Sequence, residues 1–569
     1  MSEPTRVCGM IGAGAAARVR AMAETLGLST DPQSGDVVVQ EDGLFVVGAG
    51  ITARPQAAGR AWMFSTATPS ADRLGRTPVE WEQAAREVDV AGLVRDEQSR
   101  VLLHASVSGV QPLYVEVHDD VVVFSTRLEP LVRTASGSLR PDWSAWAAVL
   151  GAGAPMAGRT TVEGVRRLAP MQAVVVEHGR ARTISAPWTW ESVTPEAGLD
   201  RETAARRGLT DEIVEVLSSE VAAVAERPLQ PMLSGGRDSR MLTGLAVRAS
   251  DADSAPVTAW STSSDIGHTL EELTGSQVAR LVGAEQQIVS GRQDRFPEDF
   301  LDYARATGFQ ASFHVWLMPV ARRLAAEPGT ILDGLGGGVF LGGGFPDDER
   351  LLAVGSTPDA LVENRFARAC KYLKAVEELL TAEAAQAVAA RVWEDFRGVA
   401  EAYADHPNGA TLTAYLTRTL PGISMAPAAV LGSSRPTAVP IMSDAVVSRA
   451  LRVPHEAKRG GAWYPDLMER VHPEFRRIPT AAELTRSRQH KRRGAAIEAA
   501  RWYRDLVLAS PAAALLGPQL GQGSPEDWQR QLEVTGGQHV IRGLALLALW
   551  FDEHESCLVE TDVAALSGS

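Results

Sequence analysis

The sequence predicts two domains in series, an α+β sandwich over residues 1–195 and an α/β domain with a parallel sheet over residues 200–569. The first part consists mainly of short runs that are rich in β-branched and aromatic residues, whereas the second alternates long helical patterns with short strands. A glycine-rich turn near residue 235 joins one of those strands to a helix. At 569 residues the chain is also long enough for two or more domains.

The sandwich is predicted from strands that are separated by glycine-rich or acidic turns. Amphipathic patterns predict helices over residues 15–26 and 80–92. The predicted strands cover residues 37–39, 44–47, 101–104, 112–115 and 121–124. Short strands accompanied by two helices indicate an α+β arrangement.

The second domain follows a proline-bearing linker over residues 185–198. Its first predicted elements are a helix over 212–225, a strand over 229–233, a helix over 241–248 and a strand over 257–262. Pro228 and Pro231 limit the length of the first strand, because proline cannot donate a hydrogen bond to a sheet. The alternation of helices and strands predicts a parallel sheet. Near the C-terminus, residues 543–551 predict a short apolar helix.

The turn between the first strand and its helix has the composition of a phosphate-binding loop. Glycines at 235 and 236 remove the Cβ atoms that would block the close approach of an anion. Ser234 and Ser239 can donate to phosphate oxygens, and Asp238 has the side chain needed to hold Mg²⁺ against them. A strand, a tight turn and a helix in succession also present backbone N–H groups and a positive helix end to the anion. The loop differs from the GxxxxGK[ST] loop of kinases and GTPases, and an ordinary serine- and glycine-rich helix cap is the alternative interpretation.

Composition excludes several classes of function. Hydrophobic residues make up 45% of the chain and charged residues 22%, as in an ordinary globular protein. The net charge of -14 argues against a general binder of nucleic acid or anionic membranes. Three widely spaced cysteines give neither a disulfide framework nor a zinc spacing. Without a membrane-length apolar run or a signal-peptide pattern, the expected location is the cytoplasm.

The stretch Ser234-Gly235-Gly236-Arg237-Asp238-Ser239 resembles the SGGxDS loop of the ATP-pyrophosphatase superfamily. A second stretch, Cys8-Gly9-Met10-Ile11-Gly12, is similar to the CGIxG opening of class II glutamine amidotransferases. The two in this order resemble the layout of asparagine synthetase B and its relatives over roughly residues 8–495. The resemblance implies an N-terminal nucleophile-type sandwich followed by an α/β adenine-nucleotide α-hydrolase-like (PP-loop) synthetase domain.

The glutaminase half of this resemblance departs from the family pattern. A nucleophilic N-terminal cysteine uses its own α-amine as base, but Cys8 follows seven other residues and Ser2 stands where the exposed cysteine belongs. No NGE-type segment that would hold glutamine is present. We therefore interpret the first domain as a structural remnant, in which Cys8 is a small buried hydrophobic residue.

The synthetase half contains a second informative stretch. Residues 331–343 resemble the family's GxGxDxxFGG segment, but Gly338 occupies the place of its Mg²⁺-binding aspartate. Asp238 alone, or Asp333 in addition, is then the expected metal ligand. In a basic run near residue 490, Lys491 precedes Gly494 and matches the family lysine that faces the pyrophosphate and the reacting acyl group. The implied ATP contacts are Leu233, Ser234, Gly235, Gly236, Asp238, Ser239, Ser261 and Gly334, the implied catalytic residues are Lys491 and Asp238, and the implied metal ligands are Asp238 and Asp333.

Two further groups of residues have alternative interpretations. Asp265, Glu271 and Glu272 match a family helix, and we interpret them as a solvated helix face. The run from Ser312 to Pro319 places His314 between aromatic residues. It is predicted to be a buried helix start, with the lining of an acceptor pocket as the alternative.

The resemblance implies an ATP-dependent carbon–nitrogen ligase. In this family a carboxylate reacts with ATP to give an acyl-adenylate and pyrophosphate, and an amine then forms the amide. Relatives without a glutaminase close rings, as lasso-peptide macrolactam cyclases and β-lactam synthetases do. Leu335 stands at the tyrosine position of the β-lactam enzymes, so the lasso-peptide cyclase is the first hypothesis. The expected cofactors are ATP and Mg²⁺, and the expected partners are a peptide or amino-acid-like substrate and, from the same pathway, a leader-binding protein and a protease. A small-molecule amide synthetase and a non-catalytic nucleotide- or peptide-binding protein are the alternatives, the latter favoured by Gly338.

Overall fold

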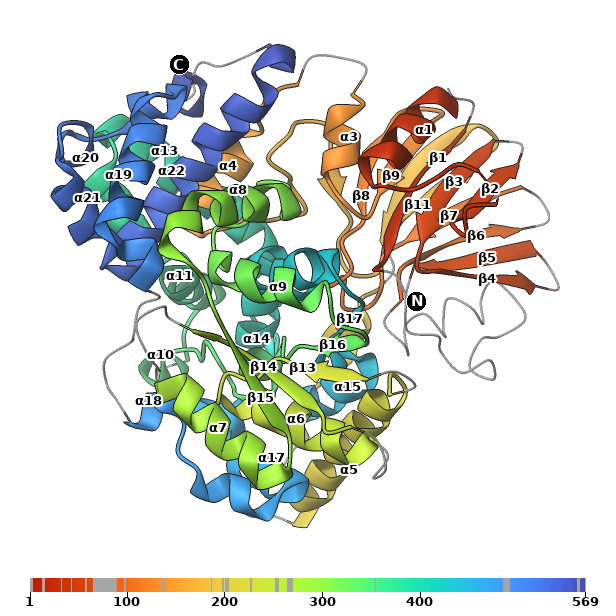
Figure 1. Cartoon of the computed structure of the whole chain (residues 1–569), viewed down its shortest axis with the longest axis vertical. Coiled ribbons are helices and arrows are strands. Elements are labelled where there is room, and N and C mark those ends of the chain that lie inside the picture. The colour runs from red at the N-terminus through yellow and green to blue at the C-terminus, as the bar shows by residue number, and fades with distance from the viewer. Residues whose placement is uncertain are drawn as a thin grey trace.

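The structure is a computed structural model of the 569-residue chain. It describes residues 4–12, 16–31, 33–41, 43–56, 59–64, 90–96, 99–135, 139–185, 187–196, 199, 204–225, 228–250, 255–263, 270–353, 355–484, 492–559 and 563–567. Two parts built around β-sheets and a third that is helical are visible in Figure 1. The first sheet part contains the N-terminal strands, and the second contains the glycine-rich turn.

The N-terminal part is a sandwich of two six-stranded antiparallel sheets. The strand orders are β10-β8-β9-β1-β3-β2 and β12-β11-β7-β6-β5-β4. The strands are β1 (Arg6–Ile11), β2 (Val37–Glu41), β3 (Leu44–Ala49), β4 (Ile51–Gln56), β5 (Gly59–Phe64), β6 (Gly92–Asp96), β7 (Val101–His104), β8 (Tyr114–Val117), β9 (Val122–Ser125), β10 (Arg166–Arg167), β11 (Gln172–Glu177) and β12 (Arg180–Ser185). All five predicted sandwich strands are present, although β8 begins two residues later than predicted.

Strand β1 lies in the middle of its sheet and is buried on both faces. Val7 and Ile11 point into the core between the two sheets, where Phe124 of β9 also packs. Cys8 and Met10 alternate with them and face α1 (Ala16–Thr25), the helix predicted over 15–26. Cys8 is fully buried, and burial raises the pKa of its thiol to about 12. The interpretation of Cys8 as a buried hydrophobic residue is therefore confirmed.

The other predicted helix of the first domain, 80–92, falls mostly on residues outside the described ranges. Its last residue is predicted wrongly, because Gly92 begins β6 and pairs with Met63 and His104 of the neighbouring strands. Pairing with two strands satisfies the backbone hydrogen-bonding groups at Gly92, and this tertiary effect overrides the local helical pattern of the sequence.

The second sheet is parallel, as predicted. Its strands are β13 (Leu229–Pro231), β14 (Thr258–Ser263), β15 (Glu285–Ser290), β16 (Thr330–Leu332) and β17 (Thr437–Ala438). Ladders join β15 to β14, β13 to β16 and β16 to β17, and a parallel bridge between Met232 and Trp260 connects the two groups. The resulting order is β15-β14-β13-β16-β17. Strand β13 ends two residues before its predicted end, in keeping with the proline at 231.

Helices cover both faces of this sheet, and α6 and α7 lie across it from α9 in Figure 1. The helices around the sheet are α5 (Ala204–Ala222), α6 (Arg237–Ala249), α7 (Leu270–Val282), α8 (Phe296–Ala306), α9 (Met318–Leu324), α15 (Asp444–Arg452) and α17 (Tyr464–Val471). The predicted helix over 212–225 corresponds to α5, which starts earlier, and the one over 241–248 to α6, which starts at Arg237 directly after the glycine turn.

The remaining helices form the helical part and the connections. They are α3 (Glu129–Arg133), α4 (Trp143–Gly151), α10 (Glu349–Ala353), α11 (Pro358–Ala369), α12 (Leu373–Leu379), α13 (Ala382–Ala400), α14 (Gly409–Ala414), α16 (His455–Lys458), α18 (Ala481–Leu484), α19 (Ile497–Leu508), α20 (Pro518–Gly521), α21 (Pro525–Leu532) and α22 (Thr535–His554).

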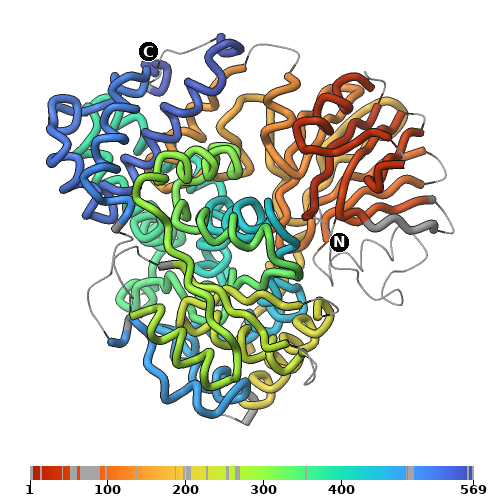
Figure 2. The backbone as a smooth tube through the Cα atoms, viewed as in Figure 1, coloured from red at the N-terminus to blue at the C-terminus, as the bar shows by residue number. Residues whose placement is uncertain are grey.

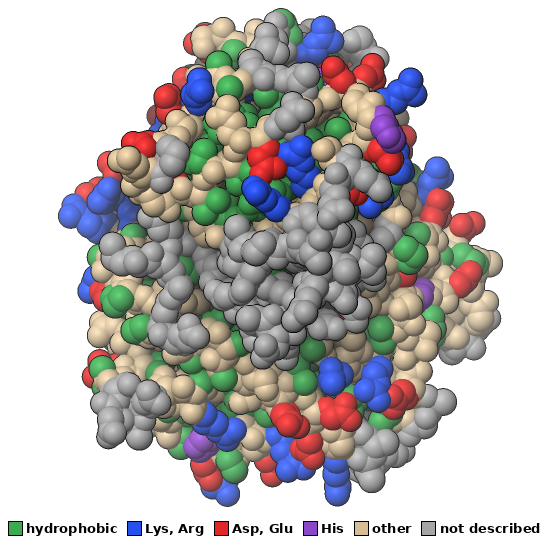
Figure 3. All heavy atoms as spheres, turned by 90° about the vertical axis from the view of Figure 1, so that its right-hand side faces the viewer, with side chains coloured by type: hydrophobic (Ala, Val, Ile, Leu, Met, Phe, Trp, Pro, Cys, Tyr) green, Lys and Arg blue, Asp and Glu red, His purple; other side chains and the backbone are tan. Residues whose placement is uncertain are grey.

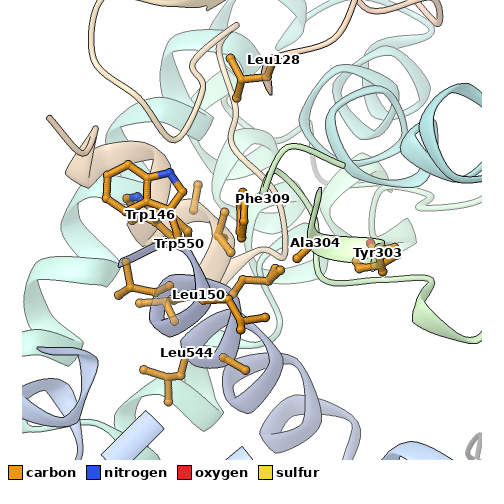
Figure 4. Packing of buried hydrophobic residues seen from close by; sticks show 14 of the residues in the cluster. Leu128, Trp146, Leu150, Tyr303, Ala304, Phe309, Leu544 and Trp550 are labelled. Carbon is orange, nitrogen blue, oxygen red and sulfur yellow. The ribbon is translucent and has the colours of Figure 1, made fainter. Parts of the chain in front are cut away.

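Helix α4 belongs to the sequence of the first domain but packs in the helical part. The chain leaves the sandwich after β9, contributes α4 to a layer with α13 and α22, and returns to the sandwich at β10 (Figure 2). Every residue of α4 except Ser144 is buried, and Trp146 lies edge-on to Trp550 of α22 at 5.7 Å between ring centroids (Figure 4). The predicted helix over 543–551 is too short, because α22 begins at Thr535 and is buried along most of its length.

The described residues of the linker pack against both domains. Trp188 donates to the Val107 carbonyl of the sandwich, and Trp190 donates to Asp444 at the start of α15, each at 2.7 Å. Both indoles pack against Tyr415, so this stretch fixes the first domain to the second. The predicted boundary between residues 195 and 200 stays a prediction.

Arg167 joins the same two parts through a buried guanidinium. It donates to the Gly109 carbonyl of the sandwich at 2.9 Å and to the Leu420 carbonyl of the second domain at 3.1 Å, with Ser424 also in reach at 3.3 Å. Burial lowers the pKa of Arg167. The carbonyl oxygens around the guanidinium replace the water that would otherwise solvate its charge.

We expect Arg167→Ala to lower the free energy of unfolding by about 3 kcal/mol or more, because at least two buried carbonyls lose their donor. The urea midpoint of the full chain measures this. The matched control is Arg166→Ala, since Arg166 is the exposed neighbour on the same strand. Equal midpoints for the two variants would show that Arg167 does not hold the domains together.

The outer surface of the sandwich side carries charges of both signs. Lys and Arg side chains are interspersed with Asp and Glu over the visible face, without a broad region of one sign among the coloured residues (Figure 3). Within the described ranges, none of the helices combines the length and the apolar composition that crossing a bilayer requires.

Candidate active site

The glycine-rich turn lies at the carboxyl end of the central strand of the parallel sheet. The Met232 N–H donates to Leu332 of β16 at 2.9 Å, and the Leu233 N–H donates to Trp260 of β14 at 2.7 Å. The end of β13 is thus held between β14 and β16. The chain passes from β13 through α6 to β14 on one side, and later in the sequence it reaches β16 on the other side. Ligands of open parallel sheets bind at such a point.

The loop itself has the geometry of an anion cradle. Gly235 has φ +70°, and a Cβ there would lie 2.7 Å from the Glu271 carbonyl oxygen. Gly236 then caps α6, and its N–H donates to Ser234 Oγ at 3.3 Å. The hydroxyls of Ser234 and Ser239 lie 3.2 Å apart at the same helix end. Two hydroxyls and the free N–H groups of a helix start can together bind phosphate oxygens.

Arg240 supports the loop from behind, a role that the sequence did not reveal. Its fully buried guanidinium donates to the carbonyls of Gly235 and Ile478, each at 2.7 Å, and to Phe475 at 3.1 Å. Burial lowers the pKa of Arg240 to about 10. Because Arg240 binds the Gly235 carbonyl from behind the loop, the N–H groups of the loop are left to point toward the site.

The two candidate metal ligands lie close together. Asp238 is in the first turn of α6 and accepts a 2.5 Å hydrogen bond from the Tyr464 hydroxyl of α17. Asp333 follows β16 and accepts from the Leu335 N–H at 2.9 Å. Desolvation raises the pKa of each carboxyl to about 6, and the charge of Asp333 contributes to the raised pKa of Asp238. Two desolvated acids side by side would be stabilised by a cation.

Glycines in the second informative stretch make room for Asp238. A Cβ on Gly334 would lie 3.0 Å from the Asp238 Cβ, and a Cβ on Gly337 would overlap the Asp238 carboxyl carbon at 2.1 Å. Gly338, in contrast, has nothing within 4 Å of a Cβ position and is exposed. Gly338, which stands in place of the aspartate of the resembling segment, therefore occupies a position that has space for a larger side chain.

Ser261 forms hydrogen bonds that support the loop. Its buried hydroxyl donates to the Leu233 carbonyl at 2.5 Å and accepts from the Gln286 amide at 2.8 Å. The cross-strand bonds fix the end of β14 beside the turn. The predicted ATP contact at this position stays a prediction, and the geometry adds a positioning role.

A cavity of about 550 Å³ opens at the loop and brings most of the predicted residues together. Of the predicted ligand contacts that the structure describes, only Gly235 does not line it. The other predicted residues that line it are Leu233, Ser234, Gly236, Asp238, Ser239, Ser261, Asp333 and Gly334. Its further lining includes Glu271, Glu272, His314, Trp316, Phe345 and Arg418.

Two interpretations made from the sequence change here. Glu272 is 2% exposed and lines the cavity, so a solvated face is wrong for this residue, because the helix turns it into the cavity wall. Glu271 is exposed, as predicted, and Asp265 lies outside the described residues. Phe313 and Val315 are buried at a helix start, as predicted, but His314 lines the cavity, which corresponds to the alternative of an acceptor pocket.

Lys491, the predicted catalytic lysine, also lies outside the described residues. The described chain before it is tied to the phosphate loop, because Glu483 pairs with Arg237 at 2.8 Å. The described chain after it is tied to α8, because Arg493 pairs with buried Asp299. Arg237 in turn lies over the Tyr464 ring, 5.3 Å from its centroid. The role of Lys491 stays a prediction.

The donor set fits Mg²⁺ bound together with nucleotide phosphates. In the described part of the chain, no three His, Cys, Asp or Glu side chains gather as a stand-alone metal site requires. Mg²⁺ commonly takes only one or two carboxylates beside phosphate oxygens and water, and Asp238 with Asp333 supplies that number.

One comparison with known proteins, the match to a family model, covers this site. Residues 212–471 match the asparagine synthase family model. No curated protein matches the chain. A solved structure described as the allosteric regulatory enzyme of purine biosynthesis is similar over 50% of this chain and 80% of its own, at 10% identity and a TM-score of 0.21. The matched residues 212–471 contain the phosphate loop, both carboxylates and the cavity lining. The asparagine synthase match supports ATP-dependent amide-bond formation as the general chemistry of this part of the chain.

Proposed function

We propose that the protein is an ATP-dependent ligase that closes a lactam ring in a peptide, as in lasso-peptide biosynthesis. The observation that carries the proposal is the cavity, which joins the phosphate loop to a wall of aromatic and basic side chains. In this proposal the nucleotide lies at the phosphate loop, and the acyl group and the amine lie beside it against this wall.

The reaction proceeds in two steps. A carboxylate oxygen of the substrate attacks the α-phosphorus of ATP, so that a new P–O bond forms and pyrophosphate leaves. The substrate amine then attacks the carbonyl carbon of the acyl-adenylate, the C–N bond forms, AMP leaves and the amine loses a proton. Overall the substrate loses one water.

Each group of the site has a part in these steps. The loop from Ser234 to Ser239 binds the departing pyrophosphate through N–H groups and hydroxyls. Asp238 and Asp333 would hold Mg²⁺, which neutralises phosphate charge. Lys491 is proposed to stabilise the charge that develops as pyrophosphate and AMP leave.

We expect the first domain to have no glutaminase activity, which favours an amine that is already part of the substrate. Cys8 is buried against α1 with its pKa raised to about 12, so it is a poor nucleophile where it lies. A β-lactam synthetase is the second enzyme candidate, but buried Leu335 provides no phenol at the corresponding position. The non-catalytic alternative is favoured by Gly338, which leaves an open position where the family has an aspartate.

A turnover assay tests the proposal. The full chain is given ATP, Mg²⁺ and a peptide with a free N-terminus and an acidic side chain. The expected products are AMP, pyrophosphate and a peptide that has lost one water, all of them dependent on the peptide carboxylate. We also expect Cys8→Ala to leave the rate unchanged and glutamine not to be hydrolysed. ADP and phosphate as products would contradict the proposed chemistry.

Lys491→Ala is expected to reduce product formation by about 10²- to 10³-fold, because one preorganised charge contact to the departing groups is lost. Binding of ATP should change little, since the phosphate loop and Asp238 remain. Single-turnover mass spectrometry measures the first effect and equilibrium dialysis the second. Cyclisation at the full rate would assign the role to another basic residue of the same run.

A further inference from the structure

One part of the cavity lining comes from segments other than the phosphate loop and is basic and aromatic. His314 precedes η4 (Val315–Leu317), which carries Trp316. Phe345 follows η5 (Gly337–Leu341), and Arg418 is on η7 (Tyr415–Ile423). These four residues from three separate segments line the same cavity, and we call them the far wall.

Arg418 is the charged residue of the far wall. Its guanidinium lies over the Phe345 ring, 4.9 Å from the centroid. Its Nε is buried without a hydrogen-bond partner, and among the described residues no carboxylate pairs with it. A guanidinium has five N–H donors, and a desolvated one normally meets a carboxylate, a phosphate or carbonyl oxygens. Arg418 is therefore a cation with donors available at the cavity.

A second arginine adds to the positive potential from behind. Arg542 of α22 is 3% exposed, and its guanidinium lies 5.7 Å from the Trp316 ring centroid. Burial, with further contributions from Arg542 and Arg418, lowers the pKa of His314 to about 3. His314 is thus neutral, its buried Nδ1 has no hydrogen-bond partner, and the net charge of the far wall is positive.

The acids of the cavity do not balance this charge. Glu271 and Glu272 come from α7, and Asp238 and Asp333 lie at the phosphate loop. The charged groups that act on Asp238 are Arg237 and Asp333, not Arg418. Asp238 and Asp333 therefore lie together at the phosphate loop, whereas Arg418 of the far wall has no carboxylate partner among the described residues.

We propose that the far wall binds a second carboxylate of the substrate, separate from the one that is adenylated, with Arg418 as its ion-pair partner. The inference rests on the proposed function and narrows it to substrates that carry an amine and at least two carboxylates. A carboxylate accepts two parallel N–H bonds from a guanidinium, and it relieves the cost of a desolvated cation. Trp316 and Phe345 provide apolar faces for the part of the substrate beside the anion.

In a peptide substrate the second carboxylate has two sources, the C-terminus or another acidic side chain. Two matched peptide pairs distinguish them. One pair ends in a free acid or an amide, and the other carries Asp or Asn at a position outside the ring-forming residue. The measured quantities are KM and kcat for pyrophosphate release by the full chain.

For wild type we expect the neutral member of one pair to have a KM about 10- to 100-fold higher, because a charge-assisted contact is lost. For Arg418→Gln we expect the raised KM with both members of that pair, because the variant has no cation that distinguishes the charged peptide from the neutral one. Arg418→Lys should recover part of the difference, and Arg397→Gln, on the exposed side of α13, should behave as wild type. The Kd of ATP measured without peptide should not change in Arg418→Gln.

A binding measurement keeps this inference separate from the proposed function. Glutarate and benzoate are titrated against the chain saturated with a non-hydrolysable ATP analogue, and the thermal midpoint is followed. At least one should stabilise wild type and Arg397→Gln but not Arg418→Gln. If that occurs and no peptide ever loses water, the proposed function fails and the carboxylate site stands. If both carboxylates act equally on Arg418→Gln and wild type, or if Arg418→Gln weakens ATP binding as much as peptide binding, the far wall is not a site for a substrate carboxylate.

Discussion

Asp238→Asn is expected to reduce the conversion of ATP to AMP and pyrophosphate by more than about 10³-fold, since a metal-dependent charge contact is worth several kcal/mol. The substitution keeps the shape of the side chain and removes its charge. The Tyr464 hydroxyl can still donate to the remaining amide oxygen, so the first turn of α6 keeps its tertiary contact. What is lost is the carboxylate that lies beside Asp333 in the cavity.

The measurement is substrate-dependent pyrophosphate release at saturating ATP and Mg²⁺, with the thermal midpoint recorded in parallel. The control is Asp359→Asn, which removes the same charge from the exposed first turn of α11. We expect the control to retain the wild-type rate and both variants to unfold at similar temperatures. If Asp238→Asn keeps more than about a tenth of the rate, the residue does not hold an essential metal.

Local patterns explain which parts of the fold could be predicted. The sandwich strands are short and flanked by turns, and the phosphate loop is a contiguous run, so both are encoded within about ten residues of sequence. Strand β13 ends where Pro231 limits it, which is again a local effect. Elements whose boundaries depend on tertiary contacts were less predictable. Helix α22 begins at Thr535 and includes Gly536 and Gly537, because its burial outweighs the poor helix propensity of glycine.

The supporting residues of the site could not be predicted for the same reason. Asp238 and Tyr464 are 226 residues apart, and Arg240 reaches Phe475 and Ile478 across a similar separation. No periodicity or motif marks such pairs. Arg240 had one weak signal, because it directly precedes the apolar pair Met241-Leu242, and an arginine that is buried must find acceptors. Arg418 had no such signal, since only the fold places it beside Phe345.

The last expected result concerns two neighbouring glycines. Gly337→Ala should reduce turnover about as much as Asp238→Asn does, by roughly 10³-fold, because both remove the carboxylate from its position. A Cβ at 337 would lie 2.1 Å from both the carboxyl carbon and Oδ1 of Asp238. No rotation of a methyl group relieves an overlap of this size, so either the carboxylate or the 334–338 segment must move.

Gly338→Ala is the matched control for this result. A Cβ at 338 meets nothing within 4 Å, and the residue is exposed with no positive φ, so alanine should be accepted without a change in rate. The two variants differ by one position and add the same methyl group, which separates displacement of Asp238 from a general effect on the loop. Turnover at saturating ATP and Mg²⁺ measures both. Equal rates for Gly337→Ala and Gly338→Ala would show that the contact between residue 337 and Asp238 does not limit catalysis, and the metal role would then move to Asp333.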